Sequence, residues 1–134
     1  MTEKKTALVT GASRGIGNAI AVELKNNGYD VIGTATSESG SESLNGLGIE
    51  GYVLDLNSSE SLESFWSLIE KNEKSISVLI NNAGITKDNI ILRMTIDDWD
   101  KVINTNLTGY FNCCKNITRH MIKNKSGKII NISS

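Results

Sequence analysis

The sequence predicts an α/β fold: a Rossmann-type, doubly wound parallel sheet with helices on both faces, in three layers. Short β-branched runs alternate with longer amphipathic segments, which is typical of parallel strands joined by crossover helices. A glycine-rich segment, residues 10–17, follows the first of these runs and leads into a helical pattern. At 134 residues the chain is long enough for one domain and too short for two. We therefore expect one dinucleotide-binding domain, residues 1–134, with strands one to five in the order 3-2-1-4-5.

The expected strands are residues 6–10, 30–35, 51–54, 77–81 and 128–132. Between the first two, apolar residues recur at helical spacing from Ile16 to Leu24, and Gly28 is placed to end that helix. After the third strand, residues 57–59 offer capping oxygens for a second helix. The apolar stripe of that helix is Leu62, Phe65, Trp66 and Ile69. We expect Trp66 to belong to the core.

A third helical region is expected from Thr95 to Met121, because the spacing of Thr95 to Asp98 resembles a capping box. Within it, Gly109 is expected to mark a bend. The segment 37–48 is rich in serine and glycine, which predicts a loop with a short helix.

The glycine-rich segment has the composition of a phosphate-binding loop. Gly11, Gly15 and Gly17 allow a tight turn, a close approach of the backbone to a pyrophosphate and close packing of the helix on its strand. The N–H groups that open the following helix then stabilise phosphate charge. Taken alone, the pattern also fits an ordinary glycine-containing turn. The cofactor-binding residues expected in the loop are Gly11, Ala12, Ser13, Arg14, Gly15, Ile16 and Gly17.

The end of the second strand favours NADP(H) over NAD(H). Sites that prefer NAD usually have an acidic side chain there, whereas this chain has hydroxyls, including Thr36. Arg14 in the glycine loop suits a 2′-phosphate, since a guanidinium meets phosphate with paired charge-assisted bonds. The alternatives are that Glu38 accepts the ribose hydroxyls and that Arg14 is a solvated loop charge.

The overall charge selects no macromolecular partner. The 14 Lys and Arg residues nearly balance the 15 Asp and Glu residues, so neither nucleic acid nor an anionic membrane is expected to bind. No apolar run is long enough to span a membrane, and the first residues lack a signal peptide, so we expect a cytoplasmic protein. The adjacent Cys113 and Cys114 are expected to pack a helix, and their spacing suggests no metal site.

Two motifs at the right separation together resemble a known family. Thr-Gly-x-x-x-Gly-x-Gly is matched at residues 10–17, and Asn-Asn-Ala-Gly is matched at residues 81–84. Both are motifs of the short-chain dehydrogenases/reductases, and segments 31–38 and 81–89 look like the bacterial 3-oxoacyl-[acyl-carrier-protein] reductases of fatty-acid synthesis. The resemblance implies NADPH-dependent reduction of a 3-oxoacyl chain carried by acyl carrier protein, and a homotetramer.

The resemblance also implies roles for single residues. Asp55 resembles the residue that contacts the adenine amino group, Leu56 is its backbone neighbour, and Asn82, Ala83 and Gly84 lie on the cofactor side of the fourth strand. Capping of the following helix is the alternative for Asp55.

Two further positions resemble catalytic residues of the family. Asn106 matches the asparagine that holds a helix bend and a water for proton relay, with an ordinary polar residue as the alternative. Ser134 matches the serine that hydrogen-bonds the substrate carbonyl.

The family's proton donor, a tyrosine four positions before a lysine, has no match here. Tyr29, Tyr52 and Tyr110 all lack a lysine at that offset. We therefore expect an N-terminal part of an enzyme, inactive by itself, truncated before the Tyr-x-x-x-Lys segment and the C-terminal strands. Its apolar fifth strand would then need a partner at its edge. A reductase for another carbonyl substrate and a non-catalytic nucleotide-binding module remain as alternatives.

The remaining candidates are charged. His120 has no nucleophile or metal ligand near it in sequence, so a surface position is expected. The local basic cluster consists of Arg119, Lys123, Lys125 and Lys128. It fits docking of an acidic carrier protein, and it fits equally a solvated helix end whose cations suit the helix dipole.

Overall fold

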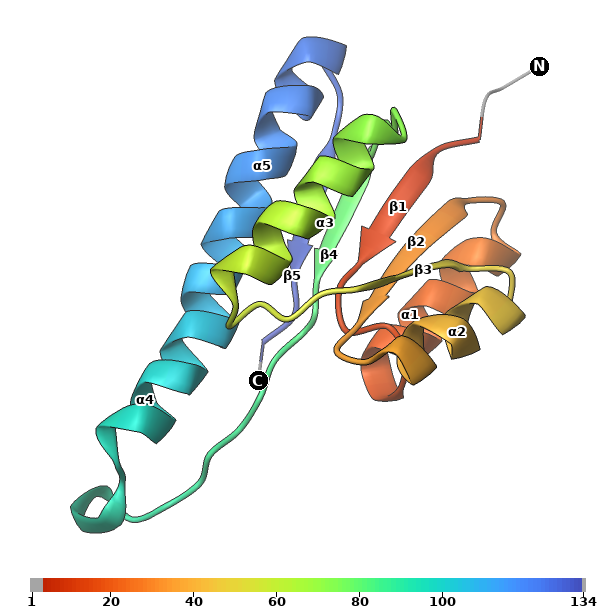
Figure 1. Ribbon diagram of the computed structural model, residues 1–134. Helices are drawn as coiled ribbons and strands as arrows, with labels where there is room; N and C mark the ends of the chain where they lie inside the picture. The colour runs from red at the N-terminus through yellow and green to blue at the C-terminus, as the bar shows by residue number, and fades with distance from the viewer. Residues whose placement is uncertain (1–3, 134) are drawn as a thin grey trace.

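A five-stranded parallel sheet in the order β3-β2-β1-β4-β5 forms the middle of the molecule (Figure 1). The computed structural model describes residues 4–133. The strands are β1 Thr6–Val9, β2 Asp30–Ala35, β3 Glu50–Val53, β4 Val78–Asn81 and β5 Lys128–Asn131. All neighbouring strands pair in parallel, so the predicted α/β sheet and its strand order are confirmed.

Helices cover both faces of the sheet. The helices are α1 Gly15–Asn26, α2 Glu38–Gly46, α3 Ser59–Lys71, α4 Ile96–Ile103 and α5 Gly109–Asn124, with a short 3-10 turn at Ile91–Arg93. Helices α1 and α2 lie on one face, and α3 and α5 lie on the other (Figure 1). A π-helical turn, Asn104–Thr108, joins α4 to α5 without a break.

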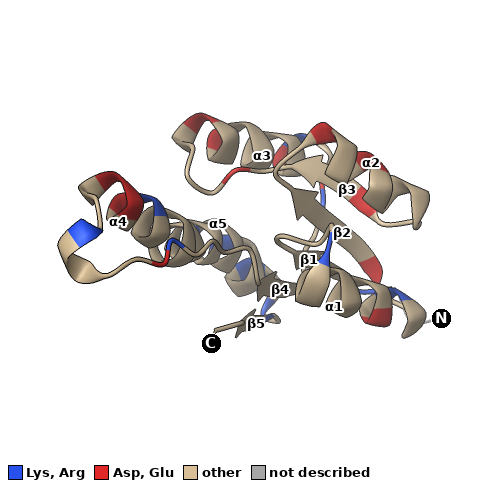
Figure 2. Ribbon diagram, turned by 90° about the horizontal axis from the view of Figure 1, so that it is seen from below, with Lys and Arg blue, Asp and Glu red and all other residues tan. Residues whose placement is uncertain are grey.

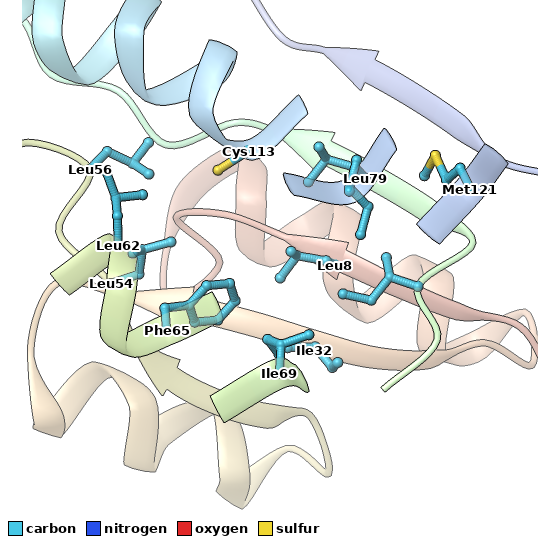
Figure 3. Close-up of a cluster of buried hydrophobic side chains, with 12 residues drawn as sticks. Leu8, Ile32, Leu54, Leu56, Leu62, Phe65, Ile69, Leu79, Cys113 and Met121 are labelled. Atoms are coloured by element: carbon cyan, nitrogen blue, oxygen red, sulfur yellow. The ribbon is translucent and has the colours of Figure 1, made fainter. Parts of the chain in front are cut away.

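The three central strands, β1, β2 and β4, contribute side chains to two separate cores. Along β1, Leu8 faces α3 and α5, whereas Ala7 and Val9 face α1 and α2, as the alternation of a strand requires. Figure 3 shows the first core, in which Phe65 of α3 lies among leucine and isoleucine side chains of the sheet. Full burial of a side chain of this size contributes about 1.5–3 kcal/mol. Trp66 is only half-buried and donates from Nε1 to Asn112 Oδ1 at 3.2 Å, so it lies at the edge of this core.

The segment expected to be a loop with a short helix contains helix α2, which takes up nine of its residues. Ser37 caps it by accepting from the Gly40 N–H at 3.1 Å, and Leu44, fully buried, anchors it against the sheet. This packing overrides the low helix propensity of the serines and glycines.

Two helix signals are confirmed and one is corrected. Gly28 has a φ of +90° just after α1, as expected for a residue that ends a helix. Thr95 caps α4 by accepting from the Asp98 N–H at 3.1 Å. The irregularity lies not at Gly109, which has ordinary helical angles of φ −61° and ψ −43°, but in the π turn directly before it. A Cβ at Gly109 would lie 2.9 Å from Leu56 Cβ, so its lack of a side chain lets the helix pack closely on that residue.

The C-terminal elements α5 and β5 differ in burial. Cys113 is buried in the core under α5, and burial raises the pKa of its thiol to about 12, so it packs as a neutral side chain. In contrast, β5 is exposed along its whole length, with Ile130 47% exposed. No helix within residues 4–133 is long and apolar enough to cross a membrane.

Candidate functional site

A cleft of about 590 Å³ lies at the carboxyl ends of β1, β2, β3 and β4. Its position matches the crevice in which open α/β sheets bind ligands. The predicted residues that line it are Gly11, Ser13, Arg14, Gly15, Ile16, Thr36, Asp55, Leu56, Asn82, Ala83 and Gly84. Segments from four different parts of the chain therefore meet at one place.

Two predicted loop residues shape the cleft from beneath rather than line it. Ala12 is fully buried, and its N–H donates to Thr34 O at 2.7 Å, so this amide is already occupied. Gly17 is also buried, and a Cβ there would overlap the carbonyl oxygen of Gly11 and the side-chain amide of Asn82. Gly17 therefore lets the start of α1 approach the loop.

The loop backbone requires glycine at two further positions. Gly11 has a φ of +62° and Gly15 a φ of +60°, which L side chains rarely adopt. At Gly11 a Cβ would also lie 2.8 Å from Ala83 Cα. The loop is consequently pressed against the end of β4.

The first turn of α1 differs from those of α2, α3 and α4. Ser37, Ser58 and Thr95 cap α2, α3 and α4 with side-chain oxygens, but Arg14 does not cap α1. No acidic residue occurs in that first turn either. The N–H groups that open α1 therefore remain available for an external acceptor, and the helix dipole favours an anion there.

Thr10 ties the glycine loop to β4. Its buried hydroxyl accepts from the N–H groups of Asn82 and Ala83, both at 3.0 Å, and donates to Ile80 O at 3.4 Å. Asn82 Nδ2 donates in turn to Thr10 O at 3.2 Å and Gly11 O at 3.1 Å. These bonds fix the two predicted motifs against each other.

Asp55 and Thr36 stand at the ends of β3 and β2 with exposed side chains. Asp55 Oδ1 accepts from the Asn57 N–H at 2.9 Å, and the Asp55 N–H donates to Ser61 Oγ at 2.9 Å. Asp55 therefore forms a local turn contact before α3 while its carboxylate lines the cleft. Ser58 and not Asp55 caps α3, so the capping alternative for Asp55 is wrong, and its cofactor role stays a prediction.

Asn106 holds the segment that follows β4. Its Oδ1 accepts from the Ile85 N–H and its Nδ2 donates to Ile85 O, each at 2.9 Å. The side chain projects from the π turn into a second pocket of about 690 Å³ beside the cleft. This pocket adjoins the cleft through Asn82 and Gly84, which line both. Ser134 lies outside the described residues.

The residues that sequence reasoning missed at the site include three on the helix that carries Asn106. Lys101 and Thr105 line the cleft from the helix, and Tyr110 lines the second pocket. The Tyr110 hydroxyl donates to Ile132 O at 3.2 Å, and burial raises the pKa of this phenol. The sequence offered one signal for Tyr110, namely that it follows the predicted site residue Asn106 by four positions in a helix.

His120 is remote from both pockets. It is half-buried on α5 and lines a groove with Trp66 between α3 and α5. No cluster of three potential metal ligands occurs in the described part of the chain.

Residues 5–134 match the family model of the short chain dehydrogenases. The chain belongs to this family. The short-chain dehydrogenases are oxidoreductases that use nicotinamide cofactors, which agrees with the class of ligand predicted for the cleft.

Relatives and a solved structure of the family agree with this assignment. The chain is 47% identical to a 3-oxoacyl-[acyl-carrier-protein] reductase FabG of Vibrio harveyi and 48% identical to one of Pseudomonas aeruginosa. These matches cover 98% and 97% of this chain and 55% of each relative. A short-chain dehydrogenase from Streptomyces avermitilis superimposes with a TM-score of 0.90 at 30% identity, over 100% of this chain and 51% of that one. The chain thus spans about half the length of these short-chain dehydrogenases.

Proposed function

We propose that this chain is the dinucleotide-binding part of a reductase that uses NADPH to reduce a 3-oxoacyl chain on acyl carrier protein to the 3-hydroxyacyl form. The cofactor half of the proposal is carried by one observation: Arg14 and Thr36 line the same cleft as the uncapped start of α1. The substrate half is supported by the names of the FabG relatives.

The residues present fit a dinucleotide. The free N–H groups at the start of α1 receive the pyrophosphate, and the absence of side chains at Gly11 and Gly15 leaves room for it. Asp55 and Leu56, which line the cleft after β3, hold the adenine, and Arg14 binds the 2′-phosphate. Asn82, Ala83 and Gly84 line the side next to the second pocket.

The chemistry that the cofactor supplies when bound is a hydride for the carbonyl carbon. The residues of this chain bind the cofactor and orient the reacting groups for the hydride transfer. Asn106 keeps the Ile85 segment in place at the border of the two pockets, and Ser134 orients the carbonyl oxygen. The assignment of residues 1–134 to a dinucleotide-binding domain, a homotetramer and a cytoplasmic location are parts of the same proposal.

Cofactor preference tests the proposal most directly. In the full-length protein, Arg14→Ala is expected to weaken NADPH binding about tenfold to a hundredfold, since charge-assisted bonds to phosphate contribute about 1.5–3 kcal/mol. NADH binding should change little, because it lacks the 2′-phosphate. Fluorescence titration with both reduced cofactors measures this.

Arg93→Ala serves as the control, because Arg93 lies in the 3-10 turn and does not line the cleft. Wild-type protein that binds NADH as tightly as NADPH would refute the NADPH preference.

Carrier docking is expected at the end of α5. Lys125 caps this helix with a φ of +53°, and the exposed Lys128 begins β5. Reversing both charges in the full-length protein should raise the KM for a carrier-bound substrate several-fold at low salt, through lost attraction to an acidic partner. A small thioester substrate that lacks the carrier provides the control, because its KM should stay constant. An unchanged KM for the carrier-bound substrate would eliminate this docking site.

A further inference from the structure

Lys101 lies in α4, on a helix face whose orientation toward the sheet is fixed by packing. Thr105, one turn later, is 7% exposed and lines the cleft, and Gly109, a further turn on, packs against Leu56. This face of α4 and α5 is therefore turned toward the connection from β3 to α3. Lys101 lines the cleft as a result of that packing, although its side chain is exposed.

Lys101 is not committed to an ion pair. The first turn of α4 carries Asp97 and Asp98, and Figure 2 shows acidic and basic residues close together on this helix. An exposed helix face would typically pair Asp97 with Lys101 at i and i+4. Within residues 4–133, however, no carboxylate oxygen lies within 4.0 Å of Lys101 Nζ. Its ammonium group remains available to another anion.

The charge of the cleft depends on this residue. Its ionisable lining side chains are Arg14, Asp55 and Lys101. Two cations and one carboxylate give a formal charge of +1, and without Lys101 the balance would be zero. Arg14 belongs to the α1 side of the cleft and Lys101 to the α4 side, so an anionic ligand would meet a cation from each side.

We propose that Lys101 is a cofactor-recognition residue whose ammonium group attracts the adenosine-phosphate half of the dinucleotide. The assignment rests on the proposed function of the cleft. The adenosine half is specified because the helix face with Lys101 is turned toward Leu56, which follows Asp55 at the end of β3. Lys101 adds to the phosphate attraction of Arg14 and of the α1 start.

The test compares Lys101→Met and Lys101→Glu with the wild type in the full-length protein. We expect NADPH affinity to fall about threefold for Lys101→Met and about tenfold for Lys101→Glu at low salt. The first variant changes the charge of the cleft by one unit and the second by two, and water between the side chain and the phosphate weakens each effect. The fragment 2′,5′-ADP should lose the same factors, and the differences should shrink at high salt. Fluorescence and calorimetric titrations measure the affinities, and thermal unfolding checks that the fold is unchanged.

Lys115→Glu is the matched control, because Lys115 lies on α5 and lines the groove between α3 and α5 instead of the cleft. Its affinity for both ligands should equal that of the wild type. If the wild-type protein binds NADPH, and Lys101→Glu binds 2′,5′-ADP as tightly as the wild type does, the assignment of Lys101 is wrong while the proposed function stands. If the wild type binds no nicotinamide nucleotide, the proposed function itself is wrong.

Discussion

The Gly17→Ala variant is expected to lose cofactor binding by at least a hundredfold and to be destabilised by several kcal/mol. The added Cβ would overlap the Gly11 carbonyl oxygen and the Asn82 side-chain amide, and a backbone oxygen cannot move without moving the loop. Overpacking of a tight site costs about 1–3 kcal/mol, and the two hydrogen bonds from Asn82 Nδ2 would be lost in addition. Urea unfolding and cofactor titration measure the two effects.

Gly46→Ala is the matched control for this substitution. Gly46 is the last residue of α2, and a Cβ there would meet no atom within 4 Å. Alanine is favoured over glycine in a helix by about 0.8–1 kcal/mol, so this variant should be neutral or slightly more stable and should bind cofactor normally. Normal cofactor binding by Gly17→Ala would show that close packing at the start of α1 does not matter for the site.

Replacement of Thr10 by valine is expected to destabilise the protein by about 2–4 kcal/mol, since two part-buried N–H groups would lose their acceptor. Valine matches threonine in shape, so the packing of this fully buried side chain would be retained. Because Thr10 joins the glycine loop to the end of β4, cofactor affinity should fall as well. Chemical unfolding and titration provide the measurements.

Thr10→Ser separates the hydroxyl from the methyl group. Serine keeps the acceptor and loses one methyl group, which costs about 1 kcal/mol when buried. Cofactor affinity should therefore stay near that of the wild type. Equal stabilities of the valine variant and the wild type would contradict the role assigned to this hydroxyl.

Sequence patterns predicted the parts of the fold that depend on local signals. The strands follow from short β-branched runs, and the glycine loop follows from residues whose backbone angles only glycine adopts easily, such as Gly15. The extent of helix α2 could not be predicted in this way, because its serine and glycine content favours a loop and the burial of Leu44 is a tertiary effect.

The candidate site was predictable where it is built from contiguous motifs. Thr10–Gly17 and Asn81–Gly84 each carry their own signal, and their meeting follows from the adjacency of β1 and β4. Lys101 carries no such signal, since its place depends on how α4 is rotated relative to the sheet. The pairing of Asn106 with the Ile85 backbone likewise needs the path of a helix and a loop far apart in sequence.

The π turn at Asn104–Thr108 sets the rotational phase between α4 and α5. A π turn contains about one residue more than an α turn, so the side chains before it are offset by roughly 100° from the positions that an uninterrupted α-helix would give them. Deleting one residue here would restore the ordinary repeat and swing Lys101 around the helix axis, away from the cleft. This stretch should therefore tolerate exchanges of side chains far better than changes in its length.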